Sequence, residues 1–317
     1  MAQTASTKPR FFYGYWILAI AFIYLVIYSG GGVGAFSLFV RPLQEEFGWG
    51  RGEIMVAFTI YFLVSGFSSP VIGSLIDRYG VKGVATAGAV IAGTSFISLT
   101  QLQGIWHYYL AYTFFGIGSA AFGPVPASAL ISNWFKKRRG LLIGVVSAGL
   151  GVGILVVAQL LSGFILPAFD WKTGYLVLGA STGIPLVLTV FFVRTRPEEI
   201  GLRRYGDELA TDGLTEAQAT KPVIDIDLKT ALRTPVLWLM VVSYFLGGYS
   251  AMGLTQNQVP YLQDIGFPLP EAAVALLGLG IGSAVGKFIF GWLCDRISPR
   301  YAWAISLLLL AGELSSS

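Results

Sequence analysis

Eight long apolar segments constrain the fold of this chain more than any other feature of its sequence. They cover residues 15–40, 54–76, 84–101, 108–135, 141–169, 174–193, 236–262 and 272–293, and part of a ninth begins near residue 301. About 20 mostly apolar residues suffice for a helix to cross the hydrocarbon core of a bilayer. The segments are too long for barrel strands and lack period-two alternation. We therefore expect an all-α membrane protein, because helices satisfy their backbone polar groups internally.

The composition agrees with this fold class. Charged residues make up 12% of the 317 residues, compared with roughly 25% in soluble domains, and the mean hydropathy is +0.69. The 40 glycines suit helices that pack closely in lipid. Cys294 is the only cysteine, so an intramolecular disulfide is excluded. The net charge of +4 is spread over several short loops, so we expect no nucleic-acid partner.

The distribution of lysine and arginine predicts the orientation, because these residues remain preferentially on the cytoplasmic side. With the N-terminus inside, the outer loops hold only Arg41, Arg51 and Lys172, and a single further cation, Lys287, lies within a span. The basic cluster at residues 136–139 then lies inside, where it fixes the topology or binds anionic lipid. We predict a multi-pass protein of the cytoplasmic (inner) membrane with a cytoplasmic N-terminus.

A polar segment at residues 195–234 divides the apolar segments into two groups. It carries both charge signs and includes Pro197 and Pro222. We expect an N-terminal six-helix bundle at 1–194, a cytoplasmic linker at 195–234 and a partial C-terminal bundle of helices seven to nine at 235–317. The chain stops within an apolar segment followed by ELSSS, which indicates a truncated second half and leaves its activity open.

One loop motif, G-x-x-x-D-R, occurs twice at equivalent places in the two groups, which indicates a duplicated bundle. The first copy comprises Gly73, Asp77, Arg78, Gly80 and Lys82, and the second comprises Gly291, Asp295, Arg296 and Arg300. The two aspartates lie at helix ends, where they can pair with an arginine or cap a helix N-terminus. We assign these residues, together with Arg138 and Arg139, a gating or structural role.

The motif resembles the signature loop of the major facilitator superfamily. Four further segments resemble the monocarboxylate and oxalate/formate antiporter branch of that family: residues 36–49, residues 133–151 with NWFKKRRGLLIG and AGLG, LRTP at 232–235, and VPY at 259–261. The resemblance covers essentially the whole chain and implies a helical bundle of the major facilitator type. It also implies a transporter that works by alternating access, with no enzymatic activity and no cofactor.

Lys287 is the one charge well inside a complete span. Burying it costs roughly 2.5 to 3.5 kcal/mol on insertion scales, so something must offset that cost. Its helical neighbours Ser283, Ala284, Gly280 and Gly291 are all small, so this face can line a cavity. One interpretation is a substrate-binding cation; the alternative is a lysine that donates to backbone carbonyls and has no ligand.

The resemblance adds a specific role for this position. In the resembled branch a cationic residue on helix eight, commonly arginine, binds the substrate carboxylate, whereas lysine offers a point charge without the bidentate fork. Proton-coupled members carry a lysine on helix one and an acid on helix eight, and this sequence has Gly34 and Ser283 there. The resemblance therefore implies a small carboxylate substrate and exchange or anion-coupled symport. The oligomeric partner stays unknown.

Weaker candidates for substrate binding are the polar residues near mid-helix: Ser283, Tyr28, Tyr61 and Asn257, with Gln256 beside the last. Each of these side chains is more often a packing or helix-linking residue than a ligand. A histidine-based enzyme is disfavoured because the only histidine, His107, lies at an outer helix end and no acidic pair is buried. A channel, a receptor or sensor, and a non-transporting homologue remain as alternatives.

Glycine spacing predicts where helices pack. A spacing of four places Gly278, Gly282 and Gly286 on one stripe of helix eight, and Gly140, Gly144 and Ala148 on one stripe of helix five. Close helix contact is the default expectation for both stripes. The glycines at residues 30–34 are harder to explain by packing alone, and we expect them to loosen helix one at mid-membrane depth.

Overall fold

The computed structural model describes residues 12–205, 233–294, 296, 301 and 305, and within this part the regular elements are all helices. The expected ninth helix, from residue 301, falls almost entirely outside the described residues. The elements are α1 (Gly14–Ser29), η1 (Gly30–Gly34), α2 (Phe36–Phe47), α3 (Arg51–Leu99), α4 (Ile105–Phe122), α5 (Pro124–Trp134), α6 (Arg139–Leu160), η2 (Leu161–Ile165), α7 (Leu166–Ala168), α8 (Trp171–Ser181), α9 (Gly183–Phe192), η3 (Pro197–Ile200), α11 (Pro235–Asp264) and α12 (Leu269–Cys294).

Seven helices of the described chain are long and apolar enough to span a membrane. One of them, α3, has 49 residues, which is roughly 74 Å at 1.5 Å per residue. A bilayer with its headgroups is only about 40 to 45 Å thick, and the backbone of α3 leaves helical geometry at Gly80, where φ is 79°. The helix therefore comprises two spans that meet at a glycine turn, which gives the eight spans expected from the sequence.

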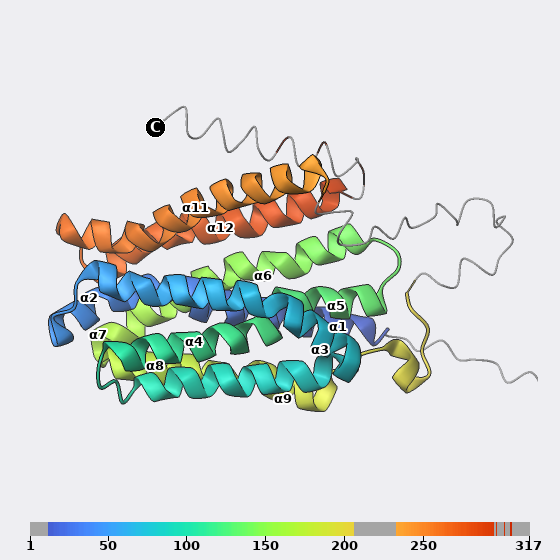
Figure 1. Cartoon of the computed structure of the whole chain (residues 1–317), viewed down its shortest axis with the longest axis horizontal. Coiled ribbons are helices and arrows are strands. Elements are labelled where there is room, and N and C mark those ends of the chain that lie inside the picture. The colour runs from blue at the N-terminus through green and yellow to red at the C-terminus, as the bar shows by residue number, and fades with distance from the viewer. Residues whose placement is uncertain (1–11, 206–232, 295, 297–300, 302–304, 306–317) are drawn as a thin grey trace, which may run out of the picture.

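The helices form a bundle with two distinct ends (Figure 1). We call the end that carries the loop at residues 136–139 the basic end. The other end, where α2 meets α3 and α11 meets α12, is called the opposite end. α11 and α12 lie on one side of the bundle, where α12 packs along α6 and α11 packs on α2 (Figure 1). The fold is therefore a helical bundle of six spans joined to the first helices of a second group.

The first span changes from α-helix to π-helix through its glycine segment, η1. This wider helix agrees with the loosening expected from the sequence, and packing accounts for the glycines as well. A Cβ added at Gly30 would lie 2.3 Å from the Val157 side chain, and one at Gly34 would lie 2.9 Å from the Ile154 Cα. The glycines thus let the first span approach α6 closely.

α6 and α12 also approach each other through small residues, but on a different face of α12 from the one expected. A Cβ at Gly144 would lie 2.8 Å from Gly291 Cα, and one at Gly151 would lie 2.3 Å from Gly280 O. The expected stripe of Gly278, Gly282 and Gly286 makes no such contact in the described structure: apart from the local backbone of α12 itself, no described atom lies within 4 Å of a Cβ added at these glycines. Because α12 carries small residues on several faces, spacing alone did not identify the packing face.

A side chain larger than glycine in this contact should force the two helices apart. We expect Gly151→Val to cost about 1 to 3 kcal/mol, the usual range for overpacking, because its Cβ would meet the Gly280 carbonyl and the Ala284 backbone. The measurement is the thermal unfolding midpoint in detergent. Gly282→Val is the matched control and should leave the midpoint unchanged, whereas equal effects of the two substitutions would contradict the assigned packing face.

Candidate functional site

Lys287 lies on the face of α12 that packs against α6. Its backbone carbonyl is 2.9 Å from the position of a Cβ at Gly144, and its half-buried side chain donates a hydrogen bond from Nζ to Ser283 Oγ, one turn earlier. The structure thus brings together two of the residues singled out in the sequence. Among the described residues no carboxylate forms an ion pair with Lys287.

The hydrogen bond to Ser283 offsets only part of the cost of burying the ammonium. A hydrogen bond that involves a charged group contributes about 1.5 to 3 kcal/mol, against the 2.5 to 3.5 kcal/mol cost of a lysine at mid-membrane depth. An ammonium has three N–H donors, and Ser283 accepts from one of them. The remaining donors and the net positive charge suit an anion.

Tyr28 and Tyr61 form a second group on the first span and α3. Tyr61 is fully buried beside Tyr28 and Ser119, and a Cβ at Gly32 would lie 2.5 Å from its hydroxyl. Tyr28 packs on Gly123, where the fourth span breaks between α4 and α5. These tyrosines come from the first span and α3, whereas Lys287 belongs to α12, so we treat the tyrosines and the lysine as separate candidates.

Asn257 lies near the opposite end and binds a side chain of the first six spans. Its Oδ1 and backbone oxygen accept from Arg51 Nη2 at 3.0 and 3.3 Å, and its Nδ2 donates to Gly253 O at 2.8 Å. These contacts make Asn257 a helix-linking residue, the alternative weighed from the sequence. Its neighbour Gln256 is 2% exposed and donates to the Val33 carbonyl at 3.0 Å, so it too links helices.

The first loop motif contributes a turn, and the described structure gives its aspartate no partner. Gly80 adopts the left-handed φ that the turn requires. Asp77 is exposed and forms no ion pair with the described residues, so the expected pairing is not seen. Arg78 lies over the Tyr79 ring at 5.2 Å from its centroid. Lys82 is half-buried, and Gly73 has open space around it within the described chain.

The second copy is described only in part, since Asp295 and Arg300 lie outside the described residues. Gly291 packs on Gly144, as noted above. Arg296 lies over the Trp292 ring, with 4.4 Å from Cζ to the centroid. This copy therefore contributes to the α6–α12 contact through its glycine.

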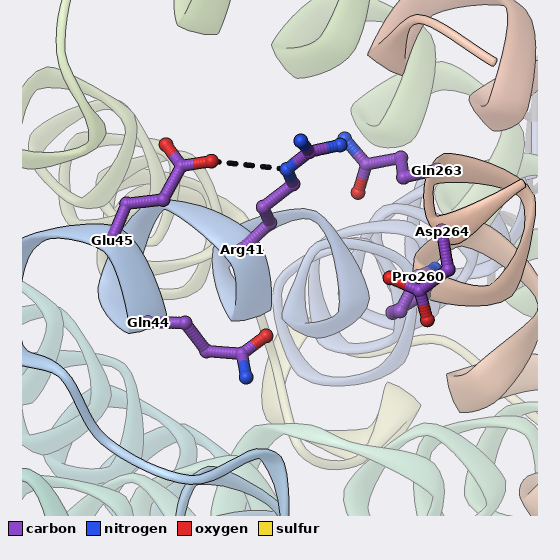
Figure 2. Close-up of a pocket in the computed structure, with 6 residues that line it drawn as sticks. All are labelled: Arg41, Gln44, Glu45, Pro260, Gln263 and Asp264. Atoms are coloured by element: carbon purple, nitrogen blue, oxygen red, sulfur yellow. Dashed lines mark hydrogen bonds and ion pairs between the residues drawn. The ribbon is translucent and has the colours of Figure 1, made fainter. Parts of the chain in front are cut away.

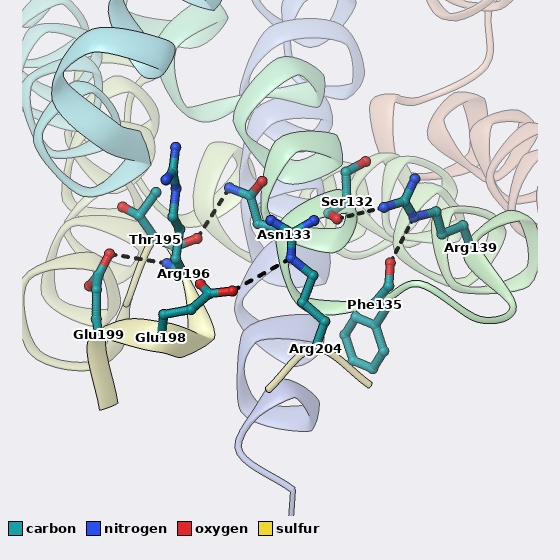
Figure 3. A network of polar contacts seen from close by, with 9 residues as sticks. All are labelled: Ser132, Asn133, Phe135, Arg139, Thr195, Arg196, Glu198, Glu199 and Arg204. Atoms are coloured by element: carbon teal, nitrogen blue, oxygen red, sulfur yellow. Dashed lines mark hydrogen bonds and ion pairs between the residues drawn. The ribbon is translucent and has the colours of Figure 1, made fainter. Parts of the chain in front are cut away.

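A network of polar contacts at the basic end ties the start of the polar segment to the first six spans (Figure 3). Arg139 donates to the carbonyls of Phe135 and Ser132 at 2.7 and 3.0 Å, while Arg138, the residue before α6, has a left-handed φ of 58°. Asn133 donates to Thr195 O at 3.2 Å. Thr195 is the first residue of the linker predicted from the sequence, and in the structure it contacts α5 through Asn133.

A polar cavity of about 410 Å³ lies at the opposite end, between α2 and α11 (Figure 2). Its lining residues come from both groups of helices: Arg41, Gln44, Glu45, Pro260, Gln263 and Asp264. A second cavity, of about 460 Å³, lies between α3 and α4 and includes His107. Neither of these two cavities is lined by Lys287. Two of the three outer cations lie at the first cavity: Arg41 lines it, and Arg51 donates to the lining residue Asp264.

Comparison with known proteins agrees with this architecture. The chain is 25% identical to the oxalate:formate antiporter of Oxalobacter formigenes over 292 residues, which are 90% of this chain and 64% of that protein. It is 23% identical to monocarboxylate transporter 12 of Mus musculus over 306 residues, covering 92% and 62% of the two chains. The chain thus spans about 64% of the length of the first of these relatives.

Solved structures show the same fold. A bacterial homolog of the human lysosomal transporter Spinster, in an inward-facing and unoccupied conformation, superposes with a TM-score of 0.70 at 19% identity, covering 92% of this chain and 64% of that one. The proton:xylose symporter XylE superposes with a TM-score of 0.65 at 13% identity, covering 90% and 70%. The family model of the Major Facilitator Superfamily matches residues 16–312. With eight apolar spans in this arrangement, the chain belongs to the major facilitator superfamily, whose members are transporters and not enzymes.

Proposed function

We propose that this chain acts in secondary active transport of a small organic anion, a monocarboxylate or dicarboxylate, by alternating access. The observation that carries the proposal is the half-buried ammonium of Lys287, whose hydrogen-bond partner in the described structure is the neutral hydroxyl of Ser283. A carboxylate supplies both the missing negative charge and acceptors for the remaining N–H groups. The names of two relatives, an oxalate:formate antiporter and a monocarboxylate transporter, support the same substrate class.

The neutral character of Ser283 favours exchange or anion-coupled symport over proton symport. A carboxyl group at this position would neutralise the ammonium when ionised and release it when protonated, which would couple anion binding to a proton. A serine hydroxyl does not titrate in the physiological range, so it supplies no counter-charge to the ammonium. The substrate anion itself then provides the counter-charge in each transport step.

The proposal also includes the orientation of the chain in the membrane and the two groups of helices that move relative to each other. The basic end faces the cytoplasm, because lysine and arginine cluster there, and the opposite end faces outward in the inner membrane. Residues 1–194 and 235–317 act as two bodies, and residues 195–234 connect them. The contacts of Thr195 and of the Arg194 carbonyl with α5 attach the start of that connection to the first body.

Removal of the charge at Lys287 should weaken anion binding. We expect Lys287→Ala to weaken binding of labelled carboxylates to the purified chain by at least tenfold, because a buried charged contact contributes about 2 kcal/mol or more. Lys287→Arg should keep a substantial part of the affinity. The measurement is equilibrium binding for a panel that includes oxalate, formate and longer monocarboxylates, followed by flux in proteoliposomes.

Lys172→Ala is the matched control, since it removes an exposed lysine at the start of α8, and it should bind like the unchanged chain. Equal binding by Lys287→Ala would contradict the role of this residue in substrate binding. Selective binding of neutral or cationic solutes would contradict the substrate class. Saturable anion binding without flux would identify a receptor or a non-transporting homologue instead of a carrier.

An acid in place of Ser283 should compete with the substrate. We expect Ser283→Asp to form an ion pair with Lys287 one turn away and to lower anion affinity at neutral pH. Ser283→Asn, which adds a side chain of similar size without a charge, should lower the affinity less. Ser283→Ala, which only removes the hydroxyl, should retain anion binding. Binding curves at neutral pH test this expectation, and equal losses in Ser283→Asp and Ser283→Asn would contradict it.

The proposed orientation predicts which end of the bundle a membrane-impermeant reagent can reach in intact cells. In a Cys294→Ser background, Lys172→Cys should react with a membrane-impermeant maleimide added outside, because residue 172 lies at the opposite end. Lys137→Cys, at the exposed basic end, should react only after the cells are permeabilised. The reverse pattern would place the basic end outside and contradict the proposed orientation.

A further inference from the structure

One arginine joins α3 to the last turns of α11. Arg51, the first residue of α3, donates from Nη1 to Asp264 Oδ2 at 3.2 Å and from Nη2 to Asn257 Oδ1 at 3.0 Å. The arginine precedes its two partners by more than 200 residues, so these bonds connect the two groups of helices across the opposite end. The planar guanidinium can hold both acceptors at once, which a single ammonium could not do with the same geometry.

A second contact lies deeper on the same side of α11. Gln256 is 2% exposed, and its Nε2 donates to the carbonyl of Val33 at 3.0 Å. Val33 belongs to the π-helix η1 of the first span. We call these contacts, of Arg51 with Asn257 and Asp264 and of Gln256 with Val33, the clasp.

The polar groups of the clasp are only partly satisfied. Arg51 Nε, Gln256 Oε1 and the nearby Gln263 Oε1 are buried without a hydrogen-bond partner among the described residues. Permanent interiors leave few such groups, whereas an interface that separates can expose them to water in its other state. The clasp therefore contains polar atoms that can form further hydrogen bonds with water when the interface opens.

The ion pair of the clasp, between Arg51 and Asp264, is partly exposed to solvent. The side chains of Arg51 and Asp264 are 31% and 66% exposed, and Asp264 lines the polar cavity described above (Figure 2). An ion pair with this exposure is weak, because water and salt screen it. The bond between Arg51 and Asp264 can therefore break without leaving a charge stranded in an apolar environment.

In the described chain, the exposure of the α11 side chains differs between the basic end and the end that carries the clasp. Near the clasp Thr255, Gln256, Val259 and Gln263 are buried. Toward the basic end the side chains of Trp238, Phe245 and Tyr249 are 54%, 67% and 75% exposed. Among the side chains of α11 that the structure describes, the buried ones thus lie near the clasp.

We propose that the clasp is the outer gate of this transporter, closed in this structure, and that its contacts break when the substrate site opens to the outside. The proposal rests on the transport function and orientation proposed above. It assigns Arg51, Asn257, Asp264 and Gln256 to gating, and it gives Asn257 a role other than substrate contact. The clasp must be weak enough for the two states to interconvert, and its few polar bonds meet that requirement.

A thiol placed behind the clasp reports its opening. Val33→Cys in a Cys294→Ser background puts a thiol at a position that is 7% exposed, and it keeps the backbone carbonyl to which Gln256 donates. A single net hydrogen bond shifts an equilibrium by about 3- to 10-fold. We expect Arg51→Gln or Gln256→Leu to raise the rate of labelling by an impermeant reagent, added from outside, by about this factor.

Arg41→Gln is the matched control. Arg41 lies at the same rim and pairs with Glu45 at 3.0 Å, but both residues belong to α2, so its loss should leave the labelling rate unchanged. The exchanged pair Arg51→Asp with Asp264→Arg should restore slow labelling. Wild-type rates in both Arg51→Gln and Gln256→Leu, or equal acceleration by Arg41→Gln, would overturn the gate. Acceleration in Arg51→Gln that the exchanged pair does not reverse would indicate lost packing and would also overturn it.

The outcome for the gate is separable from the outcome for the substrate site. Labelling is measured without any carboxylate present, so a failed binding experiment at Lys287 leaves the labelling result intact. Conversely, carboxylate binding that depends on Lys287 would stand even if the clasp proved irrelevant to opening.

Discussion

The close contact between α6 and α12 is the constraint on which the placement of the second group of helices depends. Gly144 and Gly151 face Gly291 and Gly280 at distances that leave no room for a Cβ. The carbonyl of Lys287 lies within this contact, so the packing that brings the two helices together also fixes the point from which the lysine side chain extends. The proposed substrate contact and the helix packing are therefore coupled through one stretch of backbone.

Much of the fold could be predicted from the sequence, because lipid allows few alternatives for a long apolar segment. The eight spans and the turn at Gly80 follow from length, hydropathy and the glycine itself. The packing face of α12 could not be predicted, since small residues such as Gly278 and Gly280 lie on more than one side of that helix. The π-helix at residues 161–165 also had no clear signal, because a π-helix depends on how the neighbouring helices pack.

The candidate site could be predicted only in part. The proximity of Ser283 and Lys287 followed from a spacing of four on one helix, which local geometry determines. The partners of Asn257 and Gln256 could not be predicted in this way, because Arg51 and Val33 are more than 200 residues away along the chain. A polar residue within a span can bind a substrate or link two helices, and only the three-dimensional arrangement distinguishes these roles.

The two contacts between the helix groups differ in a way that suits alternating access. At Gly144 and Gly291 the backbones touch directly, and the same two helices are also joined by a hydrogen bond from Gln159 Nε2 to Ala273 O at 3.0 Å. At Arg51 and Gln256 the contact consists of a few polar bonds, one of them partly hydrated, so each is individually weak. A structure that keeps the first contact and releases the second can turn about the glycine face while the opposite end opens. The backbone of Lys287 lies in the first contact, so in the proposed function its ammonium stays close to the axis of that turn.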